Sequence, residues 1–210
     1  RFANAGDFTF VVVGNFEEAA LISLIEMYLC PLPSGEKENY KDVGLRPKKG
    51  KDELLVNKGS EPKSLVNITF RGETKFSEDE NWYLKSLAEV LKIKLTETLR
   101  EEMSGVYGTG AYGGMGEHPY GSYYFAITFP CGPENVEALK KRALAELDLL
   151  VKNGPSEKDL NKVREAQLRD HKLNLESNRF WLNHIRGAAY SGEEPETMEA
   201  RENRIKNMTA

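Results

Sequence analysis

The first part of the chain has the pattern of a buried strand followed by an amphipathic helix. Residues 7–15, DFTFVVVGN, are rich in β-branched and aromatic side chains and end at Gly-Asn, which is typical of a central strand buried on both faces. Residues 17–29 then place apolar side chains at helical spacing. Four of them share one face: Leu21, Leu24, Ile25 and Tyr28. Pro31 ends this predicted helix.

Further strands are predicted by short apolar runs and by alternation. After a polar loop at 34–50, a strand is expected at about 52–57. Residues 64–72, SLVNITFRG, alternate apolar and polar side chains, as in a strand with one buried face. Residues 120–130, YGSYYFAITFP, form another such strand. Its predicted core face carries Tyr123, Phe125, Ile127 and Phe129.

A long helix is predicted between these strands. The sequence SEDE at 77–80 matches a capping box, and the helical pattern that it opens runs to about Met103. Leucines line one side of this helix: Leu84, Leu87, Leu91, Leu95 and Leu99. An extended segment is expected to begin at Tyr107.

Helices dominate the remaining sequence. Pro133 opens a helix that Gly154 closes. Pro155 begins a long helical stretch that runs to about Tyr190, with a bend or break expected near 176–179, and a short helix ends the chain. The predicted order is β-α-β-β-α-β-β-α-α plus this short helix.

That order predicts an α+β fold of two layers, because only some of the links can be crossovers. We expect a largely antiparallel sheet with helices packed on one face. No repeat, low-complexity tract or linker divides the sequence, so residues 1–210 are predicted to form a single α+β domain. The chain starts at Arg1 without a methionine or signal peptide, which favours a fragment of a longer multi-domain protein.

Composition narrows the class of partner. Hydrophobic residues make up 40% and charged residues 30% of the chain, as in soluble globular proteins. The net charge of −4 argues against nucleic acid and anionic membrane surfaces, and no apolar run is long enough to span a bilayer. Cys30 and Cys131 lie far apart and fit neither a zinc knuckle nor a disulfide framework, so we expect two buried or idle thiols.

A glycine-rich segment matches a phosphate-binding motif in residue spacing but not in the secondary structure predicted around it. Residues 108–113, GTGAYG, match G-x-G-x-x-G, but a helix precedes them and a strand follows, which is the reverse of the dinucleotide-binding order. The kinase version lacks its lysine on the next strand. We therefore expect a mobile or closely approached loop at 108–116. A standalone nucleotide-binding module would show a higher melting temperature with ATP or NAD, and we expect no shift.

Histidines do not form a zinc motif. Residues 114–118, GMGEH, resemble H-x-x-E-H with Gly114 in place of the first ligand, and the three nearby glycines and Pro119 prevent a helix. His118 is expected to be solvated, and His171 and His184 share no metal-binding face, so this chain is predicted to hold no metal and no other cofactor. Three aromatic residues at helical positions are interpreted as core rather than a ligand cage: Trp82, Phe180 and Trp181.

The stretch LREEMSGVYG, residues 99–108, carries the candidate chemistry. Gly105 is predicted to be the C′ residue that ends the long helix and reverses the chain. Arg100 could merely complement the helix dipole, and Tyr107 could be an amphipathic ring at the rim of the sheet. Alternatively, both side chains could converge on one cleft, where Arg100 would bind peptide carbonyls or a carboxylate and Tyr107 an oxyanion.

This stretch resembles the arginine-tyrosine segment in the C-terminal half of the insulinase/pitrilysin family of zinc metallopeptidases, the inverzincins, and of the related processing peptidases. The segment DFTFVVVGNFEEAALISLIEMYLCPLP is similar to the opening of the same domain, and NRFWLNHI resembles bacterial members. The resemblance covers nearly the whole chain in the right order.

The resemblance implies that zinc binding and substrate binding belong to different domains. In this family an N-terminal domain carries H-x-x-E-H and zinc, and a later domain faces it across a chamber. This chain lacks the motif, so it would be the non-zinc domain, with Arg100 and Tyr107 as auxiliary catalytic residues that bind peptide substrate. Zinc would belong to another domain of the same chain or to a partner subunit. A bacterial periplasmic location is also implied. The alternative is a catalytically inactive structural or binding subunit that kept the fold.

Overall fold

The computed structural model describes residues 4–36 and 41–210, which divide into two compact units. One unit contains residues 4–36 together with Arg164–Met208, and the other contains Lys41–Val163 with Thr209–Ala210. We refer to these as unit 1 and unit 2. The prediction of a single domain over residues 1–210 stays a prediction.

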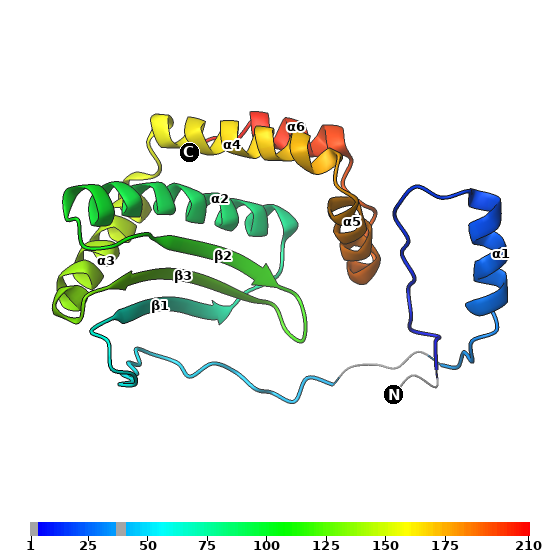
Figure 1. Cartoon of the computed structure of the whole chain (residues 1–210), viewed down its shortest axis with the longest axis horizontal. Coiled ribbons are helices and arrows are strands. Elements are labelled where there is room, and N and C mark those ends of the chain that lie inside the picture. Colours follow the sequence, from blue (N-terminus) through cyan, green and yellow to red (C-terminus); the bar gives the residue numbers. More distant parts are fainter. Residues whose placement is uncertain (1–3, 37–40) are drawn as a thin grey trace. The chain divides into compact units, whose positions relative to one another are not determined.

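Unit 2 contains an antiparallel sheet of three strands in the order β1-β3-β2 (Figure 1). The strands are β1 (Ser64–Glu73), β2 (Gly110–Gly116) and β3 (Ser122–Cys131). In the register of β1 and β3, Val66 lies opposite Phe129 and Ile68 opposite Ile127. These side chains lie on one face because directly opposed residues point to the same side of an antiparallel pair. The α+β fold with an antiparallel sheet is therefore confirmed.

Two helices cover the apolar face of this sheet. Helix α2 (Glu78–Leu95) packs against β2, and α3 (Val136–Asn153) contacts both α2 and β1. The core between helices and sheet consists of fully buried apolar side chains: Leu91, Leu95, Leu99, Ile127, Phe129 and Leu139. The predicted leucine stripe and three of the four predicted core residues of β3 thus meet in one core, whereas the prediction for Tyr123 is wrong because its side chain is exposed. The predicted cap is also present, since the Ser77 hydroxyl accepts a hydrogen bond from the Glu80 N–H.

Two predicted strands do not form. Residues 8–13 and 52–57 have no ladder partner within the described part of the chain, and most of their apolar side chains are exposed. A strand is defined by hydrogen bonds to a neighbour, whereas sequence pattern reports only the tendency to be extended. The prediction of a central strand at 7–15 is therefore wrong for this structure, as is that of a strand at 52–57.

The glycine-rich segment is a strand and not a loop. Residues 110–116 form β2, which pairs with β3 along its whole length. A Cβ at Gly113 would lie 2.6 Å from the carbonyl oxygen of Leu84, so this glycine lets α2 approach the sheet closely. The close-approach interpretation of these glycines is confirmed at Gly113, and the loop prediction is wrong.

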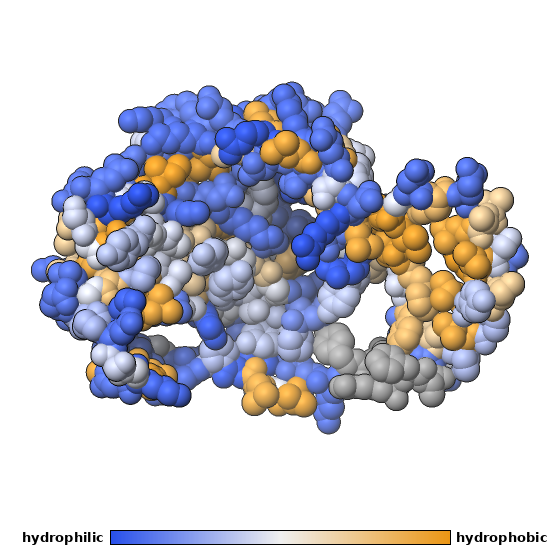
Figure 2. All heavy atoms as spheres, viewed as in Figure 1, coloured by the Kyte–Doolittle hydropathy of each residue, from blue (hydrophilic) through white to orange (hydrophobic). Residues whose placement is uncertain are grey.

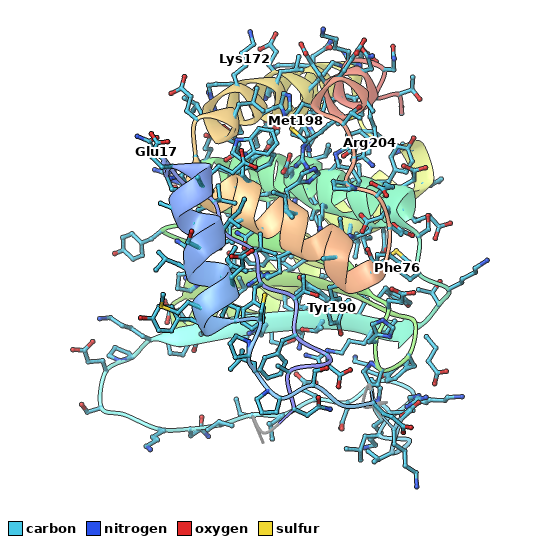
Figure 3. The ribbon with its side chains drawn as sticks, turned by 90° about the vertical axis from the view of Figure 1, so that its right-hand side faces the viewer. Glu17, Phe76, Lys172, Tyr190, Met198 and Arg204 are labelled. Carbon is cyan, nitrogen blue, oxygen red and sulfur yellow. The ribbon has the colours of Figure 1, made fainter. Side chains whose placement is uncertain are left out.

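Unit 1 is helical. It contains α1 (Glu18–Tyr28), most of α4 (Glu157–Leu175), α5 (Asn178–Ser191) and α6 (Met198–Lys206), so the predicted break near 176–179 is confirmed. Helices α4 and α6 lie side by side (Figures 1 and 3). The Arg164 guanidinium links them by donating a hydrogen bond of 2.6 Å to the Met208 carbonyl. In the described residues no helix is long and apolar enough to cross a membrane.

The three aromatic residues that were assigned to the core are only half-buried. Phe180 lies against Trp181 and stacks on His184, with ring centroids 5.4 Å and 5.7 Å away, respectively. Trp82 packs against Tyr83. The core assignment is wrong because all three side chains are partly exposed at helix surfaces. Apolar side chains of α1 are likewise exposed, as the orange atoms at the right of Figure 2 show.

Candidate functional site

The helix that carries Arg100 changes its pitch one turn before that residue. Helix α2 ends at Leu95 and continues as a π-helical turn, η1 (Thr96–Glu102). The Met103 N–H donates to the Thr98 carbonyl five residues earlier, which is the hydrogen bond of a π-helix. The Thr96 and Thr98 hydroxyls donate to carbonyls four residues earlier, and such back-bonds loosen a helix. π-helical turns occur frequently at functional sites.

The chain reverses at Ser104 and not at Gly105. Ser104 has a φ of 52°, in the left-handed region that side chains other than glycine rarely adopt. Gly105 has an ordinary φ, so its prediction as the C′ residue is wrong. A Cβ at Gly105 would lie 2.8 Å from Cδ2 of the buried Leu139. Gly105 is therefore required for close packing of the turn against α3.

The turn belongs to a closed loop. The Thr96 and Thr109 hydroxyls lie 2.9 Å apart and share a hydrogen bond, and Val106 forms an isolated antiparallel bridge with Cys131 at the end of β3. Residues 96–109, which we call the site loop, are thus fixed at both ends and in the middle. Tyr107 follows the bridge directly but lies in a bend, and the next strand begins only at Gly110, so the prediction that an extended segment begins at Tyr107 is wrong.

Arg100 and Tyr107 both project from the site loop into solvent. Arg100 is exposed, and Tyr107 is 96% exposed. Neither side chain has a hydrogen bond or ion-pair partner among the described residues. An exposed fraction this large excludes the interpretation of Tyr107 as a ring that rests on the rim of the sheet. The site loop therefore presents a cation and a phenol, neither of which is used within unit 2.

An ion-pair network holds the start of the site loop. Glu97 lies 3.2 Å from Lys94 of α2 and 3.1 Å from Lys162 of α4, and Lys94 also lies 2.8 Å from Asp159. Burial by itself would raise the pKa of Asp159. Hydrogen bonds from Lys94 and Ser156 outweigh that effect and keep its pKa below the ordinary value. The buried carboxylate therefore stays ionised and fixes the base of the loop.

A second ion pair holds the end of η1. Glu102 lies 3.6 Å from Arg142 of α3, and Arg142 also pairs with Glu146 at 2.8 Å. Arg100 is thus the cation in η1 that remains available, while the carboxylates of Glu97 and Glu102 are occupied by neighbouring helices. The polypeptide on either side of Arg100 is held in place by these contacts.

Comparison with known proteins identifies the family. Residues 1–167 match the model of the Peptidase M16 inactive domain, which covers more than half of the chain. This chain belongs to the family of Peptidase M16 inactive domains. The M16 inactive domain is 26% identical over 199 residues to the "Zinc protease PQQL-like" of Arabidopsis thaliana, a match that covers 88% of this chain and 21% of the relative. It is 27% identical over 164 residues to the "Probable zinc protease PqqL" of Haemophilus influenzae, a match that covers 77% of this chain and 17% of the relative.

Solved structures agree on the fold. The periplasmic protease PqqL from Escherichia coli superposes with a TM-score of 0.75 and 22% identity, covering 93% of this chain and 22% of that one. The ferredoxin protease FusC, solved in complex with Arabidopsis ferredoxin, gives a TM-score of 0.68 and 15% identity. The superposition covers 90% of this chain and 21% of the FusC chain. This M16 inactive domain spans about a fifth of the length of the relatives that it matches. The resemblance to the insulinase/pitrilysin family is confirmed.

The described residues of this M16 inactive domain do not fit a zinc ion. They contain no group of three or more His, Cys, Asp or Glu side chains that could hold a metal. His118 is exposed beside a cis proline, His171 is buried on α4, and His184 contacts the Glu196 carbonyl at 2.9 Å. Both cysteines are free, Cys30 exposed and Cys131 buried, and burial raises the pKa of the Cys131 thiol.

Sequence reasoning missed the residues that support the site loop. Thr109 was treated as part of the glycine-rich run, and Asp159 was not singled out. A signal for the network existed, because Ser156 and Asp159 stand three residues apart at a helix start, where such side chains cap the helix. The Thr96–Thr109 contact had no such signal, because no rule of spacing joins a helix end to a residue 13 positions later.

Proposed function

We propose that this M16 inactive domain is the substrate-binding, non-zinc domain of a zinc metalloendopeptidase, in which Arg100 and Tyr107 bind the peptide substrate. One observation carries the proposal: both side chains stand exposed and without partners among the described residues, on a loop that hydrogen bonds tie to the rest of unit 2. Residues kept for packing or charge balance would have contacts within the domain. The absence of such contacts among the described residues favours binding of Arg100 and Tyr107 to a molecule outside the domain.

Arg100 suits recognition of a peptide backbone. Its guanidinium presents several N–H donors in one plane, which match a carboxylate or adjacent carbonyl oxygens better than an ammonium does. A guanidinium in water gains little from such contacts, since exposed charge pairs contribute about 0–1 kcal/mol. Arg100 therefore becomes effective when substrate and a facing domain exclude water from it.

Tyr107 suits stabilisation of an oxyanion. Its hydroxyl can donate one hydrogen bond to the oxygen of a scissile carbonyl as negative charge develops there. At 96% exposure this bond would compete with water. The proposed function therefore requires another surface to cover Tyr107 in the assembled enzyme. Neither Arg100 nor Tyr107 can activate water, so the metal, the nucleophile and the general base would be supplied by another domain.

The parent protein, meaning the longer peptidase that we propose contains this domain, would hold zinc elsewhere in the same chain or in a partner subunit. Relatives of this chain are named zinc proteases, and one solved neighbour is a periplasmic protease. The names of the relatives support a peptide or unfolded polypeptide as substrate. The periplasmic neighbour supports the periplasm as the location. We infer no nucleic-acid or membrane partner.

Reconstitution tests this function. The 210-residue chain, the zinc-bearing part of the parent, and the two together are incubated with a reduced, carboxymethylated polypeptide. We expect cleavage only from the mixture, and much weaker cleavage when the chain carries Arg100→Ala and Tyr107→Phe together. If the doubly substituted chain restored full cleavage, Arg100 and Tyr107 would have no role in hydrolysis, and the alternative of a catalytically inactive structural or binding subunit would be favoured.

A further inference from the structure

The outer edge of β1 is open. Within the described part of the chain β1 pairs only with β3, so one side of its backbone has no ladder partner. An open edge of ten residues is a template for an added strand. Residues 46–57, which we call the strap, run on the β1 side of the sheet in both Figure 1 and Figure 3.

Arg46 fixes the beginning of the strap near the end of β1. Its guanidinium lies 2.6 Å from Asp42, 3.4 Å from Glu73 and 3.6 Å above the centre of the Tyr120 ring. Glu73 is the last residue of β1, and Tyr120 lies just before β3, opposite that end. The hydrogen bond from Arg46, with a second from the Gly44 N–H, lowers the pKa of Asp42 to about 2, so the Asp42 carboxylate is ionised throughout the physiological range.

Glu53 fixes the strap near the beginning of β1. Its carboxylate lies 3.0 Å from Nζ of Lys140, in the second turn of α3. Helix α3 follows β3 after a short turn, and Cys131 at the end of β3 is paired with Ser64 at the start of β1. The strap therefore passes from the end of β1 to its beginning, antiparallel to it. Seven residues of extended chain cover about 24 Å, most of the length of β1.

The second half of the strap has the composition of a strand but none of its contacts. Leu54 is 88% exposed, Leu55 is 81% exposed and Val56 is also exposed, while Leu65 at the start of β1 is 70% exposed. Exposure of adjacent large apolar side chains is unfavourable, and burial against a neighbouring strand relieves it. Apolar atoms are visible at the surface where the strap runs (Figure 2).

The connection between strap and β1 is suited to a hairpin. Gly59 has a φ of 101°, and Gly50 has a φ of 87°. The Lys63 N–H donates to the Glu61 carbonyl and tightens the turn before β1. Gly59 and Pro62 supply the backbone freedom and the rigid bend that turns require. The two left-handed glycines therefore bracket a segment that matches the strand predicted at 52–57.

We propose that residues 52–57 of the strap close onto the open edge of β1 as a fourth antiparallel strand, guided by the Arg46 and Glu53 contacts. The structure describes the open state, in which the strap is held near the edge without pairing to it. Closure buries Leu65 partly against the apolar strap residues that share its face of the sheet, because adjacent strand residues point to opposite faces. Closure also satisfies the outer backbone groups of β1. It also removes an edge to which another polypeptide could add. This proposal is independent of any role of Arg100 or Tyr107.

Amide hydrogen exchange of the 210-residue chain, read residue by residue by NMR, tests the proposal. Every second amide of β1 points away from β3. We expect these outward amides to be protected at least about tenfold relative to the exposed amides of residues 41–45. Fast exchange of all outward β1 amides would overturn the proposal.

Two adjacent proline variants, Leu54→Pro and Leu55→Pro, provide a matched pair. Neighbouring residues of a strand point their N–H groups to opposite sides, so only one of the two donates to β1, and proline removes that donor. We expect one variant to abolish the outward protection and the other to retain most of it, with the protection of β3 unchanged in both. Equal behaviour of the two variants would contradict a paired strap. Outward protection that appears only after addition of a reduced, carboxymethylated polypeptide would show a peptide-binding edge and would also overturn the proposal.

Discussion

The hydroxyl groups of Thr96 and Thr109 lie 2.9 Å apart and join the start of η1 to the residue before β2. This single contact closes the site loop, from which both Arg100 and Tyr107 project. The intervening turn contains a left-handed serine at Ser104. The bridge between Val106 and Cys131 and the packing of the turn on α3 support the same loop. The contact thus helps to fix the loop that carries both side chains, whose joint action on a substrate is our proposal.

Thr109→Val should loosen the site loop while leaving the fold intact. Valine keeps the shape of threonine but removes the hydroxyl, and a lost neutral hydrogen bond costs about 0.5–1.5 kcal/mol. We expect a drop of this size in the free energy of unfolding, measured with urea, and faster exchange of the amides at 104–108. Thr69→Val, at an exposed position of β1, is the control. Equal effects of the two variants would show that the contact does not hold the loop.

Gly105→Ala should destabilise unit 2 by crowding. The new methyl group would lie 2.8 Å from Cδ2 of Leu139, which is buried, and overpacking costs about 1–3 kcal/mol. Gly108→Ala is the matched control, since nothing lies within 4 Å of its added Cβ. Adding Leu139→Val to Gly105→Ala should recover part of the lost thermal stability. A neutral Gly105→Ala variant would mean that the turn is not packed on α3 as described.

The sequence predicted the core of unit 2 well, for a clear physical reason. The leucines of α2 and the alternating apolar residues of β3 are each periodic, and each period identifies a buried face without knowledge of the partner. Residues 7–15 and 52–57 have equally strong local patterns, but a strand also needs a hydrogen-bonded neighbour, which no local pattern supplies. The same limit explains β2, where glycines chosen for close approach to Leu84 were interpreted as a loop.

The candidate site was only partly predictable. Arg100 and Tyr107 are singled out by resemblance to a family and by the glycine between them, and their role stays a prediction. The π-helical turn could not be read from the sequence, because Thr96 and Thr98 are ordinary helix residues until their hydroxyls bond to the preceding turn. The left-handed conformation of Ser104 could not be read from the sequence either, because glycine is the residue that usually adopts it and Gly105 stands next to it.

Asp159→Asn should change how stability depends on pH. The pKa of Asp159 is lowered in the folded state, so its carboxylate stabilises the fold above about pH 4, and this contribution is lost as the pH falls through the folded-state pKa. We expect Asp159→Asn to lower the free energy of unfolding by about 1.5–3 kcal/mol at pH 7, as for hydrogen bonds to charged groups. The difference from wild type should shrink toward pH 2, as followed by circular dichroism. Asp148→Asn, at an exposed position, is the control, and a pH-independent difference would contradict the ionised state of Asp159.

Arg100→Ala in the parent protein should raise KM more than it lowers kcat. Loss of one or two charge-assisted hydrogen bonds to substrate corresponds to roughly 10- to 100-fold in KM. Arg100→Lys should restore only part of the affinity, because an ammonium keeps the charge but not the planar donors. Arg186→Ala, at an exposed position of α5, serves as the control. If Arg100→Lys restored KM fully, charge alone would be sufficient, and the proposed backbone recognition would be wrong.

The most direct test is the steady-state kinetics of Tyr107→Phe in the parent protein, with Tyr83→Phe as a control at another exposed tyrosine. If the Tyr107 hydroxyl stabilises an oxyanion, its loss should lower kcat by roughly 100- to 1,000-fold while KM changes little. The zinc content and the melting temperature should match those of the wild type. An unchanged kcat for Tyr107→Phe would contradict the proposal that this domain takes part in peptide hydrolysis through Tyr107.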